Sequence, residues 1–127
     1  MKFLCLICAE KVMEQMPEAD AAAHYREYAD FTESIRRSGH FIDCNRLLPA
    51  ATATTIRVRK GAITATDGPF AETKEQFGGY YVIRARDLNE AILVASRIPG
   101  AARGCVEIRA IADDQQTVQA LGLPGAA

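Results

Sequence analysis

Apolar residues fill every position of one short run near the start of the chain, Phe3–Cys8. A run without polar interruption is typical of a strand that is buried on both faces in the middle of a sheet. Aromatic and β-branched residues predict a second strong strand at Tyr80–Ala85. Phe41–Leu47 and Cys105–Ile111 also have strand character, and the latter alternates apolar with charged side chains. The pattern therefore predicts these four segments as strands.

A further pair of strands is predicted around the short turn signal Lys60-Gly61. Thr54–Arg59 alternates cleanly between apolar and polar side chains, and Ala62–Thr66 is expected to fold back beside it. The pattern leaves open whether Ala62–Thr66 joins the main sheet.

Helical spacing begins after Pro17, where apolar residues recur at intervals of three and four. Gly39 follows the last turn, as is common at the C-terminal end of a helix. His24 lies near the start of this helix, where we expect a surface position, and His40 directly follows Gly39. The apolar stripe consists of Tyr25, Tyr28, Phe31 and Ile35.

A second helix is predicted to begin at Asp87, whose carboxylate can accept hydrogen bonds from the free N–H groups of the first turn. Glu90, three residues further, can reach back in an Asp variant of the capping box. Pro99 and Gly100 end the helical segment. Its apolar face is formed by Leu88, Ala91, Ile92 and Ala95.

The elements follow one another in the order β–α–β–β(–β)–α–β, which predicts an α+β fold with a ferredoxin-like antiparallel sheet. Two helices cover only one face of such a sheet, while Phe3–Cys8 and Tyr80–Ile83 are apolar on both faces. Because a large apolar face is rarely left in water, we expect a second copy to cover it in a homodimer. The domain is expected to span residues 1–112, with 113–127 as a weakly packed C-terminal tail.

The composition narrows the classes of function. The 127 residues include 49% hydrophobic and 24% charged side chains, a balance typical of a globular domain. Fifteen basic and sixteen acidic residues give a net charge of −1, and the arginines are scattered, so we expect no direct contact with nucleic acid. The apolar N-terminal run is too short for a membrane span and lacks a signal-peptide pattern, which predicts a cytoplasmic protein without membrane contact.

Cysteine and histidine residues form no recognisable metal site. Cys5 and Cys8 are spaced as C-x-x-C, but strand alternation sends their side chains to opposite faces. We expect the cysteines, Cys44 and Cys105 included, to be reduced and to act as small core residues. His24 and His40 are candidate acid–base groups only because the ordinary pKa of histidine lies near neutrality. No metal and no cofactor are therefore predicted.

The most informative local feature is the tetrapeptide Asp67-Gly68-Pro69-Phe70. Gly68 precedes proline, which disfavours helix at this position, and the Asp67 carboxylate can accept nearby N–H groups and open a turn. In the structural interpretation Asp67 only stabilises the turn, while Phe70 and Phe77 hold the loop on the core.

In the functional interpretation Asp67 is a general base, and Glu72 and Lys74 contribute polarity and charge on the following turn. Tyr80 and Tyr81 point to opposite faces of one strand, so that one of them can line a pocket. The candidate binding residues are Gly68, Pro69, Phe70 and Tyr80.

The stretch from Thr66 to Tyr81 (TDGPFAETKEQFGGYY) resembles the signature of the DGPF-domain proteins, a branch of the YCII-related family. The likeness continues through Asp87–Ala91 and Gly104–Arg109 and covers residues 1–112. The resemblance implies a ferredoxin-like fold that assembles as a dimeric α/β-barrel. It implies little about function, apart from an association of some members with extracytoplasmic-function sigma factors.

In YCII relatives a histidine of the first helix and an aspartate near the end of the second share a cleft, which marks them as candidate enzymes. The matching positions here are Glu27 or Tyr28, and Ile98, so this pair is missing. One hypothesis is a cofactor-free enzyme or pocket protein for a small polar molecule, with its site between the dimer-facing sheet and the Asp67 loop. The other is a non-enzymatic regulatory or binding module with a sigma factor as partner.

Overall fold

A computed structural model of the chain describes residues 1–8, 15–68 and 77–124. Its strands and helices follow the predicted order, with one additional helix near the C-terminus. Two short 3-10 turns, η1 (Ala50–Thr52) and η2 (Pro99–Ala102), lie between elements. The elements are β1 (Lys2–Cys8), α2 (Glu18–Arg37), β2 (Phe41–Arg46), β3 (Thr54–Arg59), β4 (Ala62–Asp67), β5 (Gly79–Arg84), α3 (Leu88–Ala95), β6 (Cys105–Ala110) and α4 (Gln115–Leu121).

Four of the strands form one antiparallel sheet in the order β2-β5-β1-β6. Strand β1 is central, with β5 on one side and β6 on the other. Because α2 follows β1 and α3 follows β5, the arrangement is the βαββαβ unit of a ferredoxin-like fold. The predicted α+β class and the central position of the first apolar run are confirmed.

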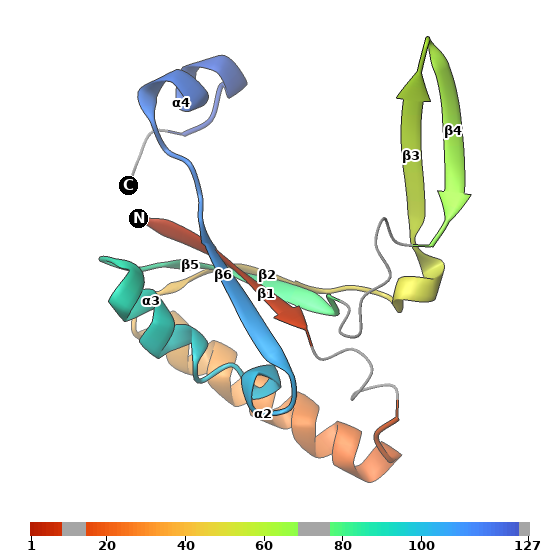
Figure 1. Ribbon diagram of the computed structural model, residues 1–127. Helices are drawn as coiled ribbons and strands as arrows, with labels where there is room; N and C mark the ends of the chain where they lie inside the picture. Colours follow the sequence, from red (N-terminus) through yellow and green to blue (C-terminus); the bar gives the residue numbers. More distant parts are fainter. Residues whose placement is uncertain (9–14, 69–76, 125–127) are drawn as a thin grey trace.

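Both α2 and α3 lie on the same face of this sheet, as predicted (Figure 1). Strand alternation turns Phe3, Cys5 and Ile7 toward the helices, where they join the buried core. Helix α2 contributes Phe31 and Ile35 to this core. The remaining core residues come from β5, α3 and the turn after it: Tyr81, Ile83, Ala85, Ala91, Val94, Ala95 and Ile98.

The buried stripe of α2 differs from the predicted one at its first position. His24 is fully buried, whereas Tyr25 is 44% exposed, so the expected surface position of His24 is wrong. Residues 24, 28, 31 and 35 are separated by four, three and four positions, which places them on one helix face. Tyr25 is turned by about 100° from His24 and lies at the edge of that face.

The helix ends follow the predicted capping. Gly39 has a φ of +82° directly after the last turn of α2, a conformation that favours glycine. The Asp87 carboxylate accepts the Glu90 N–H at 2.9 Å, and Glu90 reaches back to the Arg86 N–H at 3.0 Å. Glu90 also contacts His40 Nε2 at 2.7 Å, which joins the end of α2 to the start of α3.

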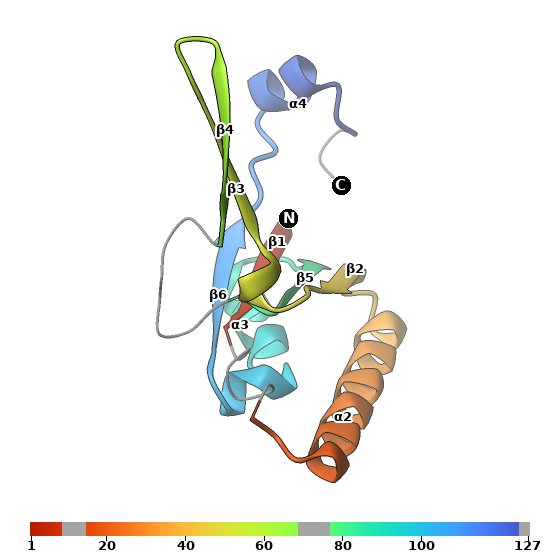
Figure 2. The ribbon, with the colours of Figure 1, turned by 90° about the vertical axis from the view of Figure 1, so that its right-hand side faces the viewer.

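Strands β3 and β4 leave the main sheet and pair only with each other, which settles the position of the Ala62–Thr66 segment. Their ribbon projects away from the body of the domain (Figures 1 and 2). Opposed pairs in register place Ile56, Val58 and Ile63 on one face of the ribbon. These side chains are 66%, 55% and 75% exposed, so the described part of the chain leaves this apolar face uncovered.

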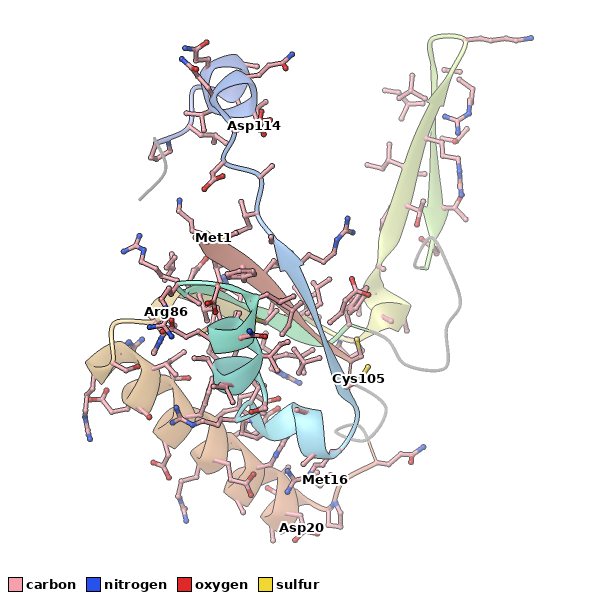
Figure 3. The ribbon with its side chains drawn as sticks, turned by 60° about the vertical axis from the view of Figure 1, so that its left-hand side comes forward. Met1, Met16, Asp20, Arg86, Cys105 and Asp114 are labelled. Atoms are coloured by element: carbon pink, nitrogen blue, oxygen red, sulfur yellow. The ribbon has the colours of Figure 1, made fainter. Side chains whose placement is uncertain are left out.

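Helix α4 lies in the segment for which the sequence predicted only a weakly packed tail. It begins at Asp114, whose carboxylate accepts the Thr117 N–H at 2.9 Å, and ends at Gly122 in the left-handed conformation. Asp114 and this helix lie apart from α2 and α3 (Figure 3). None of its residues is buried, so the helix adds local order but little packing.

Candidate functional site

A cavity of about 480 Å³ lies between α2 and the end of the sheet where β2 pairs with β5. Side chains at its edge are exposed, among them Tyr25, Arg36 and Arg46. Those further inside, such as Thr32 and Cys44, are half-buried, and Tyr81 is 4% exposed. The cavity therefore has a polar, charged mouth and an aromatic floor.

A second stripe of α2, beside the buried one, builds one wall. Residues 21, 25, 29, 32 and 36 recur at helical spacing and all line the cavity. Because this stripe lies next to the core stripe, it faces the margin of the sheet and leaves a space there. The opposite wall is formed by Cys44–Leu47 and Gly78–Tyr81.

Gly79 allows β2 and β5 to approach closely at this wall. A Cβ atom at this position would lie 2.8 Å from the backbone oxygen of Asn45, closer than real Cβ atoms come. Gly79 pairs with Arg46, and Tyr81 pairs with Cys44. The glycine therefore sets the distance at which Cys44 and Arg46 stand beside the cavity.

The floor holds a hydrogen-bond chain with assigned donors. The Thr32 hydroxyl donates to the Tyr28 backbone oxygen at 2.7 Å, which uses its only hydrogen. The Tyr81 hydroxyl, 2.7 Å from Thr32 Oγ1, must therefore be the donor in that pair. Burial raises the pKa of Tyr81, so its hydroxyl stays protonated at neutral pH.

Tyr28 gives the cavity an aromatic surface. Its hydroxyl accepts the Gly100 N–H at 3.0 Å, and burial raises the pKa of Tyr28 to about 12. Its ring lies parallel to that of Tyr81, with centroids 6.5 Å apart, while Phe31 meets Tyr81 edge-on at 5.2 Å. These contacts fix both tyrosine rings, and burial keeps both hydroxyls neutral.

The Cys44 thiol is the sulfur group of the wall. Burial, with a smaller contribution from Asp43, raises the pKa of Cys44. A neutral thiol is a poor nucleophile, so the site is not built for attack by Cys44. The other cysteines do not line this cavity. Cys5 and Cys8 are buried, as predicted. Cys105 at the start of β6 is exposed (Figure 3), so the prediction that it is a core residue is wrong.

Two guanidinium groups stand at the cavity. Arg36 lies over the Phe41 ring at 4.6 Å, and Arg46 lies over the Tyr25 ring at 5.6 Å. Glu33 also lines the cavity, but its carboxylate accepts a hydrogen bond from Arg37 Nε at 3.2 Å. The charged side chains of the described lining are therefore positive on balance.

The predicted site residues are only partly connected with this cavity. Asp67 is exposed at the end of β4, opposite Thr54, and does not line the cavity. Gly68 has a φ of +100°, and its N–H donates to the Ala53 oxygen at 2.6 Å. Tyr80 does line the cavity, and its hydroxyl accepts a hydrogen bond from Asn45 Nδ2 at 2.9 Å. Pro69, Phe70, Glu72 and Lys74 lie outside the described residues.

The site also lies on a different face from the expected one. The sequence placed it on the face away from the helices, but Tyr81 and Ile7 belong to the core that faces α2 and α3. Sequence reasoning missed Thr32, Arg36, Cys44 and Arg46. The second stripe of α2 was the available signal for the first two, since both follow Tyr25 at helical spacing.

His24 is buried beside the cavity wall but does not line the cavity. Within the described part of the chain neither ring nitrogen has a hydrogen-bond partner, and Nδ1 lies 3.6 Å from Glu27 Oε2, which Arg103 also binds. Burial, with the Arg103 charge, lowers the pKa of His24. His24 is therefore a neutral packing residue at neutral pH. At the positions that the sequence matches to the relatives' histidine and aspartate, Glu27 pairs with Arg103, Tyr28 accepts the Gly100 N–H, and Ile98 is buried.

Within the described ranges, no group of three His, Cys, Asp or Glu side chains is placed to hold a metal ion. The same ranges contain no helix that is long and apolar enough to cross a membrane.

Comparisons with known proteins agree with this architecture. The profile of the YCII-related domain matches residues 1–115. The uncharacterized protein R00369 of Rhizobium meliloti (strain 1021) is 36% identical over 95 residues, which are 73% of this chain and 71% of that protein. The 5-chloro-2-hydroxyhydroquinone dehydrochlorinase TftG of Burkholderia phenoliruptrix AC1100, in complex with 2,5-dihydroxybenzoquinone, has a similar fold. Its TM-score is 0.51 at 12% identity, over 91% of this chain and 98% of that one.

Proposed function

The chain belongs to the YCII-related family, and we propose that it binds a small organic molecule in the cavity between α2 and strands β2 and β5. The observation that carries this proposal is the makeup of the cavity walls. Its volume of about 480 Å³ lies within the range of small-molecule sites. Four consecutive residues of the DGPF-like signature, Gly78 to Tyr81, line it. A signature segment that forms a cavity wall is more simply explained by binding than by packing alone.

The fixed hydroxyls of Thr32 and Tyr81 suit the orientation of a ligand. The structural neighbour TftG is a dehydrochlorinase with a small quinone bound, which supports a small-molecule role for this fold. Tyr28, Tyr81 and Cys44 are protonated at neutral pH and cannot act as a general base. An enzymatic activity therefore needs another residue as its base. Asp67 as that base, assisted by Glu72 and Lys74, stays a prediction that an Asp67→Asn variant tests by loss of turnover at unchanged thermal stability.

Homodimeric assembly and a cytoplasmic location belong to the same proposal. Strand alternation turns Leu4 and Val82 away from the helices, and they stand opposite each other in register. The ribbon adds a second apolar face, which the described residues leave uncovered. Sedimentation at micromolar concentration should give a dimer, and a stable folded monomer contradicts this part. The sigma-factor association stays a prediction.

An experiment that fills the cavity tests the binding proposal. Ala29 lines the cavity from the exposed side of α2, whereas Ala22 is exposed on the same helix and does not line it. We expect small aromatic fragments to shift the amide resonances of Gly78–Tyr81 in the native protein and in Ala22→Trp, but not in Ala29→Trp. Binding that survives Ala29→Trp, or no fragment binding in the native protein, contradicts the proposal.

A further inference from the structure

The charge of the cavity points to the chemical class of its ligand. Arg36 and Arg46 both line it, and the guanidinium carbon of each lies over an aromatic ring, 4.6 Å from the Phe41 centroid for Arg36 and 5.6 Å from the Tyr25 centroid for Arg46. Among residues 1–8, 15–68 and 77–124, no carboxylate forms an ion pair with either guanidinium group. Glu33, the one acidic side chain among the described lining residues, is directed to Arg37.

The guanidinium group is planar and carries its N–H donors in that plane, so two of them can bind an anion side by side. Arg36 and Arg46 come from different elements, α2 and β2, but they line one cavity. Arg36 also lowers the pKa of both Cys44 and Tyr81, a contribution smaller than that of burial. This effect places its charge within electrostatic reach of the cavity floor.

The interior favours a flat apolar group. The parallel rings of Tyr28 and Tyr81 form an aromatic surface, and Tyr25 contributes a third ring nearer the mouth. The hydroxyls of Thr32 and Tyr81 have already committed their hydrogens within the protein, so the floor offers oxygen lone pairs but no charge. An aromatic ring therefore fits the interior, while its charged substituent fits the mouth.

From this arrangement we infer that the ligand is a planar aromatic anion, an aryl carboxylate or phenolate, whose ring lies against Tyr28 and Tyr81 and whose negative group lies at the mouth, where Arg36 and Arg46 supply the positive charge. The inference rests on the proposed function and adds the ligand class to it. It predicts that, of two ligands with the same shape, the negatively charged one binds more tightly. Simple hydrophobic filling of the cavity does not produce this difference.

Titration calorimetry with three probes tests the inference: 4-hydroxybenzoate, its neutral counterpart 4-hydroxybenzamide, and acetate as an anion without a ring. We expect 4-hydroxybenzoate to bind about tenfold more tightly than the amide, since a hydrogen bond to a charged group contributes at least that factor. Acetate should bind still more weakly, because it makes no contact with the rings. Equal affinity for the benzoate and the amide, or for the benzoate and acetate, overturns the inference.

Matched variants assign the effect to the two arginines. Arg36→Gln and Arg46→Gln should each weaken benzoate binding about tenfold and leave amide binding unchanged. Arg26→Gln is the control, because Arg26 is exposed on the same helix and does not line the cavity. If all three variants bind benzoate like the native protein, the inference is wrong. If the benzoate and the amide bind with equal affinity and Ala29→Trp abolishes the binding of both, only the inference fails. If neither aromatic probe binds, the proposed function fails with it.

Discussion

The strand pairs β1–β5 and β3–β4 have the same antiparallel geometry but different surroundings. In the first pair, Cys5 and Ile83 are completely buried under the two helices. In the second pair, Val58 and Ile63 are opposed in register, yet both are more than half exposed. A two-stranded ribbon with no cover is marginally stable in water. The comparison shows that alternation makes a strand amphipathic, while only packing decides whether its apolar face contributes to stability.

The largest expected effect separates these two regions directly. Ile83→Ala should lower the free energy of unfolding by roughly 2–5 kcal/mol, because it leaves a cavity in the core. Ile63→Ala removes the same atoms from the ribbon and should cost at most about 0.5 kcal/mol. Urea denaturation followed by circular dichroism measures both. Similar losses at the two positions would show that the ribbon is covered in solution, which breaks the comparison.

Substitution of one glycine in each region tests the comparison of the two strand pairs further. Gly79→Ala brings a Cβ atom against the Asn45 backbone and should cost roughly 1–3 kcal/mol as β2 moves away from β5. Gly61→Ala meets no atom within 4 Å, and its cost of about 1–2 kcal/mol arises only from the φ of +76°. Fragment binding in the cavity should weaken for Gly79→Ala alone. Loss of binding in both variants, or in neither, contradicts the role assigned to Gly79.

Acidification should lower the free energy of unfolding because His24 is buried in its neutral form. Burial lowers the pKa of His24 below its ordinary 6.5, so the unfolded chain binds a proton first. The stability due to this group is complete above pH 6.5 and falls below it, by at most about 1.4 kcal/mol per pH unit. His24→Leu should flatten this slope. A slope that is unchanged in the variant would show that His24 is not the titrating group.

The hydrogen bond between His40 and Glu90 gives a second pH range in which stability changes. This hydrogen bond is the largest of the causes that lower the pKa of Glu90. The stabilisation by Glu90 is present above its ordinary pKa of 4.5 and is lost as the pH falls through the lower folded value. Glu90→Gln should therefore lower the stability by a constant amount above pH 4.5 and remove this dependence on pH below it, in contrast to His24→Leu.

The smallest effect distinguishes neighbouring tyrosines on the two faces of β5. Tyr81→Phe removes a buried hydroxyl that donates to Thr32 and should cost about 1 kcal/mol. Tyr80→Phe removes an exposed contact with Asn45 and should change stability by less than about 0.5 kcal/mol. Thermal denaturation of the pair gives the difference. An equal cost contradicts the assignment of Tyr81 to the cavity floor.

Much of the fold follows from local patterns. The strand Thr54–Arg59 has the predicted bounds, and the other strands differ only at their ends. Asp87 caps α3, and Gly39 follows α2 in the left-handed conformation, because capping depends on residues within one turn. The candidate site was less predictable. Its motif residue Asp67 lies on the ribbon, while the cavity is lined by side chains from segments far apart in the chain.

The sequence by itself determined the order of the elements, the α+β class and the central position of β1, since periodicity and capping are local properties. Only the tertiary structure decided that His24 rather than Tyr25 is buried, because both residues fit a helical stripe within one position. It also decided that β3 and β4 leave the sheet, since they pair with each other while β2 pairs directly with β5. The cavity is also a tertiary feature: Thr32 and Arg36 of α2 line one side of it, and residues of β2 and β5 line the other.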